Sequence, residues 1–204
     1  MVRWQVQFVI GVTSLLHSKC LVRNLSVRIG PMTSADVIEI YSALVGLGIQ
    51  IWIDGGWGVD ALLGKQTRPH KDLDIALEDQ HLLRFEQFLE SRGYHRAKRE
   101  IERPFNFVLA DDGGREIDVH VISLDENGNG IYGPPENGLM YPAGSLTGTG
   151  TISGCAVICI SPQWMVKFHS GYELTEKDYR DVSAICEKYR IAVPDEYSQF
   201  KDRR

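Results

Sequence analysis

The stretch that most constrains the fold is residues 53–77, IDGGWGVDALLGKQTRPHKDLDIAL. A glycine pair, Gly55 and Gly56, follows a short apolar run and one aspartate, and Asp72 and Asp74 lie inside a second apolar run. Successive side chains of a strand point to opposite faces of a sheet, so the two aspartates share one face and their apolar neighbours take the other. The chain must therefore fold with two carboxylates side by side on a core strand.

A second acidic strand repeats this pattern. In residues 104–124, PFNFVLADDGGREIDVHVISL, two apolar runs flank an Asp-Asp-Gly-Gly turn, which predicts an antiparallel hairpin. Glu116, Asp118 and His120 alternate with apolar residues and share one face of the second strand. If this strand lies beside residues 71–77, Asp118 becomes a third carboxylate of the same cluster.

Three neighbouring carboxylates indicate a site for hard cations. Without a cation, such groups repel one another and one of them tends to stay protonated. Carboxylates on adjacent strands can hold two metal ions against a triphosphate. We therefore predict that Asp72, Asp74 and Asp118 bind Mg²⁺ or Mn²⁺. An Asp-x-Asp pattern alone is also typical of a polar strand face, so the prediction depends on the third carboxylate and the glycine pair.

Gly55 and Gly56 predict a turn between a strand and a helix. Backbone without a Cβ can approach a phosphate closely, and the N–H groups at the start of a helix favour an anion. A tight turn without a ligand is the alternative. No G-K-[ST] follows, which excludes a P-loop, and the third glycine of a dinucleotide fingerprint is missing.

The remaining pattern predicts an α/β fold, with a mixed β-sheet flanked by helices and a mostly helical C-terminal portion. Residues 125–154 are rich in glycine and proline and predict a long functional or mobile loop. Helices are expected at residues 33–49, 57–64 and 80–93, from Ser161-Pro162 onward, and at 175–190, and further strands at 50–54, 71–77 and 156–160.

Basic and acidic side chains are unevenly distributed along the chain. Residues 1–31 carry four basic and no acidic side chains, and the other residues carry 18 basic and 27 acidic side chains. We interpret residues 1–31 as an N-terminal extension outside the fold, with a targeting segment as the alternative. Residues 32–195 are expected to form the catalytic domain and residues 196–204 a tail. The acidic domain is suited to divalent cations or a cationic substrate and argues against general nucleic-acid binding.

Two further features bear on location. No apolar run reaches the 18 residues of a membrane-spanning helix. The four cysteines form no C-x-x-C pair and no disulfide framework, which favours a reduced, cytoplasmic setting.

Three stretches together resemble a known family. WIDGGWGVDALLGKQTRPHKDLDI, IDVHVI and FHSGYELTEKDYRDV are similar to segments of the small lincosamide nucleotidyltransferases. These antibiotic-resistance enzymes belong to the DNA polymerase β-like nucleotidyltransferase superfamily. The aminoglycoside 2″-adenylyltransferases resemble the first stretch more loosely. The resemblance covers roughly residues 33–190 and implies the polymerase β-like nucleotidyltransferase fold.

The resemblance also implies site residues. Asp72 and Asp74 would coordinate the catalytic metals, and Asp118 would bind metal, accept the proton of the substrate, or both. Gly55 and Gly56 would hold the phosphates of the nucleotide. The C-terminal motif adds Lys177 for the nucleotide and His169 and Asp178 for the substrate. The residues themselves add Arg68, before the acidic strand, for the nucleotide and Tyr172 for the substrate. From the residues alone, a loop arginine such as Arg68 is more often solvated, and Asp178 is simply a helix cap.

The expected reaction is transfer of a nucleoside monophosphate, AMP by preference, from a Mg²⁺-bound triphosphate such as ATP to a hydroxyl of a small-molecule antibiotic. Pyrophosphate is released, and a lincosamide is the favoured acceptor ahead of an aminoglycoside. One rival is a metal-dependent glycosyltransferase, which also uses Asp-x-Asp but leaves the glycine pair unexplained. The other is a non-catalytic regulatory or antitoxin-like domain, for which degenerate carboxylates would be expected. The sequence does not set the oligomeric state.

Overall fold

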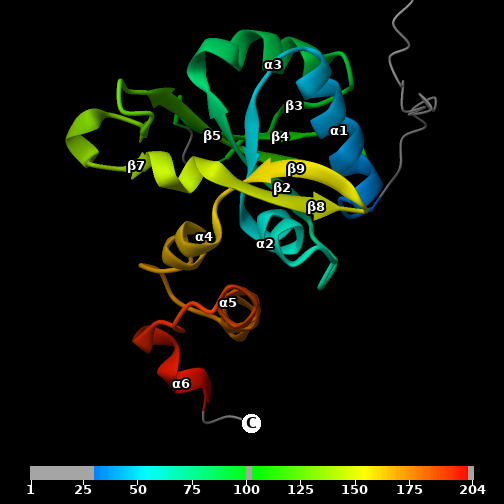
Figure 1. Ribbon diagram of the computed structural model, residues 1–204. Coiled ribbons are helices and arrows are strands. Elements are labelled where there is room, and N and C mark those ends of the chain that lie inside the picture. The colour runs from blue at the N-terminus through cyan, green and yellow to red at the C-terminus, as the bar shows by residue number, and fades with distance from the viewer. Residues whose placement is uncertain (1–29, 100–102, 202–204) are drawn as a thin grey trace, which may run out of the picture.

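The computed structural model describes residues 30–99 and 103–201 (Figure 1). Most of the predicted N-terminal extension therefore lies outside the described residues. The strands are β1 (Ile51–Ile53), β2 (Asp72–Glu78), β3 (His95–Arg96), β4 (Asn106–Ala110), β5 (Glu116–Leu124), β6 (Gly130–Tyr132), β7 (Met140–Tyr141), β8 (Gly148–Ile152) and β9 (Cys155–Cys159). The α-helices are α1 (Ser34–Gly46), α2 (Gly55–Leu63), α3 (Leu82–Glu90), α4 (Pro162–Phe168), α5 (Glu176–Tyr189) and α6 (Ser198–Lys201).

One mixed sheet organises the described part of the chain. Its strands follow the order β3-β4-β5-β2-β1-β9-β8, and β6 pairs with both β5 and β7. β2 lies parallel to β5 and antiparallel to β1, so the two predicted acidic strands are direct neighbours. In Figure 1, α1 and α3 lie above the sheet, and α2 lies below it with α4, α5 and α6. The predicted α/β architecture with a mostly helical C-terminal portion is confirmed.

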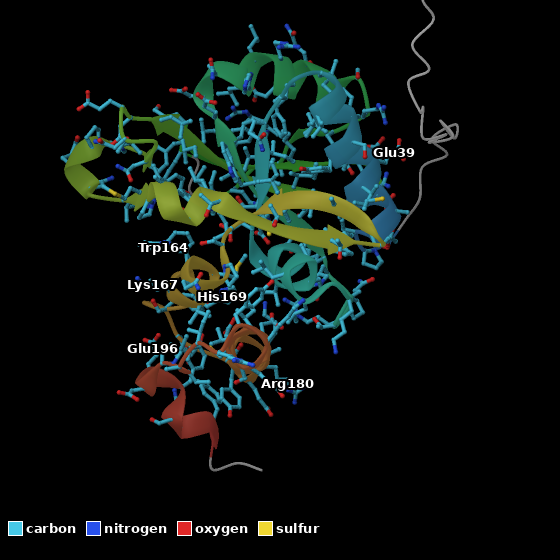
Figure 2. All side chains as sticks on the ribbon, viewed as in Figure 1. Glu39, Trp164, Lys167, His169, Arg180 and Glu196 are labelled. Carbon is cyan, nitrogen blue, oxygen red and sulfur yellow. The ribbon has the colours of Figure 1, made fainter. Side chains whose placement is uncertain are left out.

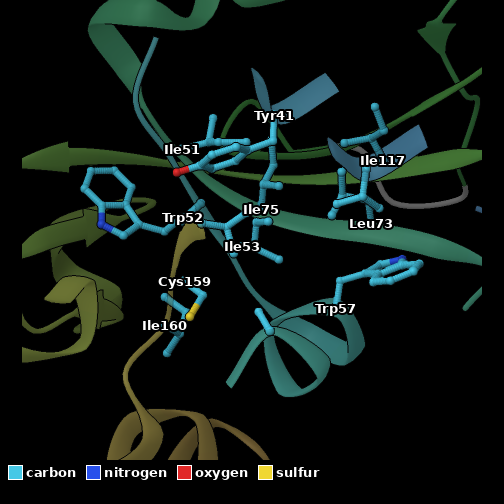
Figure 3. Packing of buried hydrophobic residues seen from close by; sticks show 14 of the residues in the cluster. Tyr41, Ile51, Trp52, Ile53, Trp57, Leu73, Ile75, Ile117, Cys159 and Ile160 are labelled. Atoms are coloured by element: carbon cyan, nitrogen blue, oxygen red, sulfur yellow. The ribbon is translucent and has the colours of Figure 1, made fainter. Parts of the chain in front are cut away.

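The core lies on both sides of the central strands. Ile51 and Ile53 of β1 and Ile75 of β2 have no solvent exposure. Figure 3 shows Tyr41 of α1 on one side of these strands and Trp57 of α2 on the other. The apolar positions predicted for the two acidic strands are thus buried, and burial leaves the alternate positions to the carboxylates.

Local sequence signals account for several element ends. Thr33 with Asp36 and Thr175 with Asp178 form the capping boxes that begin α1 and α5. Gly64 ends α2 in the left-handed region at φ 74°. The hairpin predicted over residues 104–124 is present as β4 and β5.

Two predictions about local structure need correction. The helix expected at residues 57–64 begins at Gly55, because the Asp54 side chain accepts a hydrogen bond from the Gly55 N–H and caps it. The loop expected at residues 125–154 contains β6, β7 and β8, with 3-10 turns at Pro135–Asn137 and Ala143–Thr147. Two of its glycines, Gly148 and Gly150, serve close packing: a Cβ on Gly150 would lie 2.3 Å from the Ala61 carbonyl oxygen.

The ends of the predicted domain have buried residues. Met32, its predicted first residue, is 1% exposed and pairs with His70 in an isolated β-bridge. Tyr197 and Phe200, within the predicted tail, are buried against the core. Among residues 30–99 and 103–201, none of the helices combines the length and apolar character needed to span a bilayer.

Candidate functional site

The carboxylates predicted from the two acidic strands lie on one face of the sheet. In the parallel pairing of β2 with β5, Asp74 is directly opposite Asp118, and Asp72 is opposite Glu116. Neighbouring strands are about 4.8 Å apart, so side chains in register can share a ligand. Glu116 is already neutralised, because Lys71 Nζ lies 2.9 Å and Arg99 Nη2 2.8 Å from its carboxylate oxygens.

A fourth carboxylate joins the cluster. Asp54 follows β1 and caps α2, its backbone N–H donates to the Asp74 carbonyl over 2.9 Å, and it is 8% exposed. Its Oδ2 accepts from the Tyr141 O–H at 3.0 Å, and the Tyr141 oxygen lies 2.5 Å from His120 Nδ1. Tyr141 comes from β7, so the segment predicted as a loop reaches the carboxylates directly.

The carboxylates raise one another's affinity for protons. Burial, and then the charges of Asp72, Asp54 and Asp118, raise the pKa of Asp74 from 3.8 to about 7. Burial also raises the pKa of Asp118, and its Oδ1 accepts a hydrogen bond from Asn106 Nδ2 at 2.9 Å. Such crowding is costly unless a cation or a proton lies between the groups.

Hard cations fit the donor set and the backbone spacing. Oxygen ligands from Asp72, Asp74 and Asp118 are those that Mg²⁺ and Mn²⁺ take, and burial together with the neighbouring carboxylates raises the pKa of Asp74. Within the described ranges, however, no three His, Cys, Asp or Glu side chains converge enough to hold an ion as they stand. Side-chain rotation from adjacent strands would have to complete the site.

Close packing requires both glycines of the pair. A Cβ on Gly55 would lie 2.0 Å from Asp74 Oδ2, and Gly55 has φ 54°, a conformation that favours glycine. A Cβ on Gly56 would lie 2.4 Å from His70 Nδ1 and 2.7 Å from Arg68 Nη2. The glycine pair therefore lets the start of α2 approach both the carboxylates and a guanidinium group.

A cavity of about 370 Å³ opens beside Asp54, Gly55 and Asp74. The rest of its lining is mainly aromatic and aliphatic: His120, Tyr132, Leu139, Met140, Tyr141, Phe168, His169 and Tyr172. Four of these residues come from β6, β7 and the segment between them. Large apolar side chains remain exposed there, with Leu139 at 46% and Met140 at 44%.

A second cavity, of about 270 Å³, lies beside Asp72 and Asp118 and is lined by charged and polar side chains, including Arg99 and Asn106. The carboxylates therefore stand between a mainly apolar cavity and a polar one.

The candidates from the C-terminal motif fall into two groups. His169 and Tyr172 line the larger cavity, as predicted for substrate contacts; in Figure 2, His169 lies between the sheet and α5. Lys177 is exposed, yet its positive charge lowers the pKa of Asp74, so it acts electrostatically on the carboxylate cluster. Asp178 is 5% exposed, and its oxygens accept from Thr175 and Tyr172. The contacts of Asp178 are those of a helix cap.

Arg68, predicted to touch the nucleotide, is not a solvated side chain. Its Nη2 lies 3.0 Å from Asp181 Oδ2 of α5, and its Nη1 lies 2.9 Å from His70 Nδ1. Arg68 therefore links the loop before β2 to the C-terminal helix.

The sequence is similar to those of known antibiotic-resistance proteins. A family model described as aminoglycoside-2″-adenylyltransferase matches residues 36–185. The chain belongs to this family. A lincosamide resistance protein of Staphylococcus haemolyticus is 34% identical over 155 residues, which are 76% of this chain and 94% of that protein. A 2″-aminoglycoside nucleotidyltransferase of Klebsiella pneumoniae is 27% identical over 156 residues, 76% of this chain and 82% of that one.

Solved structures of related proteins confirm the nucleotidyltransferase fold. The lincomycin-bound lincosamide antibiotic adenylyltransferase LnuA matches with a TM-score of 0.68 and 30% identity, over 80% of this chain and all of that one. ANT(2″)-Ia in complex with adenylyl-2″-tobramycin matches with a TM-score of 0.61 and 22% identity, over 76% of this chain and 88% of that one. The resemblance drawn from the three stretches is confirmed, and the homologues of this chain are antibiotic nucleotidyltransferases.

Some residues of the site were missed by the sequence analysis. Asp54 had a signal, because an acidic residue between an apolar strand and a glycine pair is well placed to cap a helix. Tyr132 and Tyr141 had none, because nothing in a glycine-rich segment tells which aromatic residue will reach a site far away in sequence.

Proposed function

We propose that this protein adenylylates a hydroxyl group of a lincosamide, using ATP and Mg²⁺ or Mn²⁺ and releasing pyrophosphate. The carboxylates of β2 and β5 together carry the proposal, because their register puts Asp74, which lines the larger cavity, opposite Asp118, which lines the polar one. Family membership supports the reaction class, and a cytoplasmic location, where ATP is abundant, suits it.

Each residue then has a role that follows from its chemistry. Asp72, Asp74 and Asp118 would hold the metal ions, which when bound neutralise charge on the triphosphate and favour in-line attack. The start of α2 at Gly55 and Gly56 favours a phosphate, with the Gly56 N–H as the donor, because the Gly55 N–H already donates to Asp54. Arg68, next to Gly56, and Lys177, whose charge acts on Asp74, add positive charge.

In this proposal Asp118 accepts the proton of the acceptor hydroxyl. It lies opposite Asp74 across the strand pair, and burial raises its pKa, which improves a carboxylate as a proton acceptor at neutral pH. The role of base and the role of metal ligand use different lone pairs of the same carboxylate, and one group can serve both.

The cavity favours a lincosamide over an aminoglycoside. A polycationic acceptor is best held by several acidic side chains, whereas the larger cavity offers only Asp54 and Asp74 and otherwise presents aromatic and aliphatic surface. An acceptor with one amine and an apolar portion matches that lining better. His169 and Tyr172, at the α4 end of the cavity, provide polar contacts for its hydroxyl groups.

The test is pyrophosphate release from MgATP, compared among lincomycin, clindamycin, tobramycin and no acceptor. We expect release only with the two lincosamides, and an adenylyl group on the antibiotic by mass spectrometry. Release only with tobramycin would keep the reaction and overturn the acceptor. Turnover of a nucleotide sugar instead of ATP would support the glycosyltransferase alternative, and an absence of nucleotide binding would support the regulatory one.

A further inference from the structure

A chain of polar contacts links α2 to α5 next to Gly56. Asp60 Oδ2 of α2 lies 2.5 Å from His70 Nε2, Arg68 Nη1 lies 2.9 Å from His70 Nδ1, and Arg68 Nη2 lies 3.0 Å from Asp181 Oδ2. Asp60, His70 and Asp181 are at most 5% exposed. Of these four residues, the function proposed above uses only Arg68.

The direction of these hydrogen bonds holds the guanidinium in one orientation. A carboxylate only accepts, so His70 donates from Nε2 to Asp60, and its Nδ1 lone pair is left to accept from Arg68. The other oxygen of Asp60 accepts from Thr67 N at 2.9 Å and from Thr67 Oγ1 at 2.6 Å. His70 therefore cannot turn without losing a bond, and Arg68 is fixed at one nitrogen by His70 and at another by Asp181.

The fixed guanidinium lies directly against the start of α2. The position that a Cβ would take on Gly56 is 2.7 Å from Arg68 Nη2. Gly56 is the second residue of the helix, where N–H groups lack partners within the helix and favour an anion. The positive charge of Arg68 is thus held at the point where the triphosphate is expected.

Helix α5 provides a firm anchor for this arrangement. Near its end, Lys188 Nζ donates to the carbonyl oxygens of Leu62 and Leu63 over 2.7 and 3.1 Å, and the Tyr189 O–H donates to Leu62 over 2.9 Å. These bonds tie the end of α5 to the end of α2. Asp181, two turns earlier, then reaches the beginning of α2 through Arg68, so α5 is connected to both ends of that helix.

From these contacts we propose that Asp181 is a positioning residue for nucleotide binding, which holds the Arg68 guanidinium at the Gly55–Gly56 turn so that it meets the phosphates. The inference rests on the proposed function, since it needs a nucleotide at that turn. A guanidinium fixed at two nitrogens loses less freedom when a phosphate binds than one that is free to move. The C-terminal helix thereby contributes to nucleotide affinity without touching the nucleotide.

A double-mutant cycle tests this by equilibrium dialysis of ATP with Mg²⁺ against the full chain. We expect Asp181→Asn to raise the Kd for ATP about tenfold, and Arg68→Ala to raise it by at least as much. In the Arg68→Ala background, Asp181→Asn should add less than about twofold, because its partner is already gone. The KM for the antibiotic should stay within about twofold of wild type in Asp181→Asn.

A matched control separates positioning from stability. Asp36→Asn breaks another buried ion pair, 2.8 Å from Arg115, that lines neither of the two cavities beside the carboxylates. We expect it to lower the urea midpoint but to leave the Kd for ATP unchanged. If Asp181→Asn does not fold, Arg68→Lys serves instead, since an ammonium keeps the charge but cannot bond His70 and Asp181 in the same geometry.

Three outcomes would overturn the inference. Wild-type affinity in Asp181→Asn would show that Arg68 needs no anchor. An equal loss with and without Arg68 would show that Asp181 acts by another route. Failure of the wild-type chain to bind MgATP would remove the nucleotide itself, and with it the proposed function.

Discussion

Two clusters of buried charge lie within a short distance of α2 and are built in opposite ways. Around Asp74, the carboxylates of Asp54, Asp72 and Asp118 repel one another, and burial adds to the cost. The other cluster joins Asp60 to Asp181 through His70 and Arg68, and there every carboxylate has a donor. The first cluster lines a cavity, and the second joins two helices.

The comparison distinguishes buried charges that stabilise the fold from buried charges that lower its stability. A buried carboxylate with its donors in place holds its neighbours in one arrangement, and removing one partner is expensive. Carboxylates that crowd one another cost stability until a cation arrives, even though Tyr141 donates to Asp54 and Asn106 donates to Asp118. A domain that keeps such a cluster next to a cavity is therefore suited to bind metal there.

The largest expected effect is on catalysis at the crowded cluster, which consists of the carboxylates of Asp54, Asp72, Asp74 and Asp118. Asp72→Ala or Asp74→Ala removes a predicted metal ligand, and we expect kcat to fall by about 10³-fold or more. The measurement is pyrophosphate release with MgATP and lincomycin. Circular dichroism is the control, because either variant should stay folded, and substantial turnover in either would contradict the metal assignment.

The next effect is on stability at the paired cluster, which consists of Asp60, His70, Arg68 and Asp181. Asp60→Ala leaves the buried His70 without its acceptor and removes both hydrogen bonds of the exposed Thr67 to Asp60. We expect the free energy of unfolding to fall by about 3 kcal/mol, measured by urea denaturation. A loss no larger than that of an exposed substitution, such as Glu176→Ala on the surface of α5, would mean that the network does little for the fold.

Removing a charge from the crowded cluster should increase the stability of the fold. Asp74→Asn keeps the shape of the side chain but ends its repulsion with Asp54, Asp72 and Asp118. In metal-free buffer we expect the variant to be more stable than wild type by about 1 kcal/mol, with catalysis lost. A destabilised Asp74→Asn would argue that the aspartate is held by donors, as Asp60 is.

The smallest expected effect is a pH dependence of metal stabilisation. The pKa of Asp74 is raised to about 7, above its ordinary 3.8, so its proton stabilises the metal-free fold below pH 4, and that contribution is lost as the pH rises to 7. Mg²⁺ needs the ionised carboxylate and should raise the melting temperature more at pH 8 than at pH 6, by about 2 °C. A shift independent of pH, measured by differential scanning fluorimetry, would place the ion elsewhere.

Much of the carboxylate site could be predicted because its geometry is local. Alternation along a strand puts Asp72 and Asp74 on one face whatever the rest of the chain does, and the hairpin does the same for Glu116 and Asp118. Only the pairing of β2 with β5 had to be supplied by the fold, and the burial of the apolar positions on both strands favours it.

The parts that could not be predicted depend on contacts distant in sequence. Gly148 and Gly150 read as loop residues, yet they are strand positions where another backbone approaches too closely for a Cβ. Arg68 and Asp181 are 113 positions apart, and neither carries a local signal that the other is its partner. Tyr141 likewise reaches Asp54 across 87 positions. Such pairings follow from packing and not from any pattern within one segment.

The most direct test of the central claim, that the crowded carboxylates form the metal site, is Mn²⁺ binding followed by electron paramagnetic resonance in the presence of ATP. Wild-type protein should retain protein-bound Mn²⁺ with ATP, and Asp74→Asn should lose it while Asp36→Asn keeps it. Equal Mn²⁺ binding by wild type and Asp74→Asn would contradict the account.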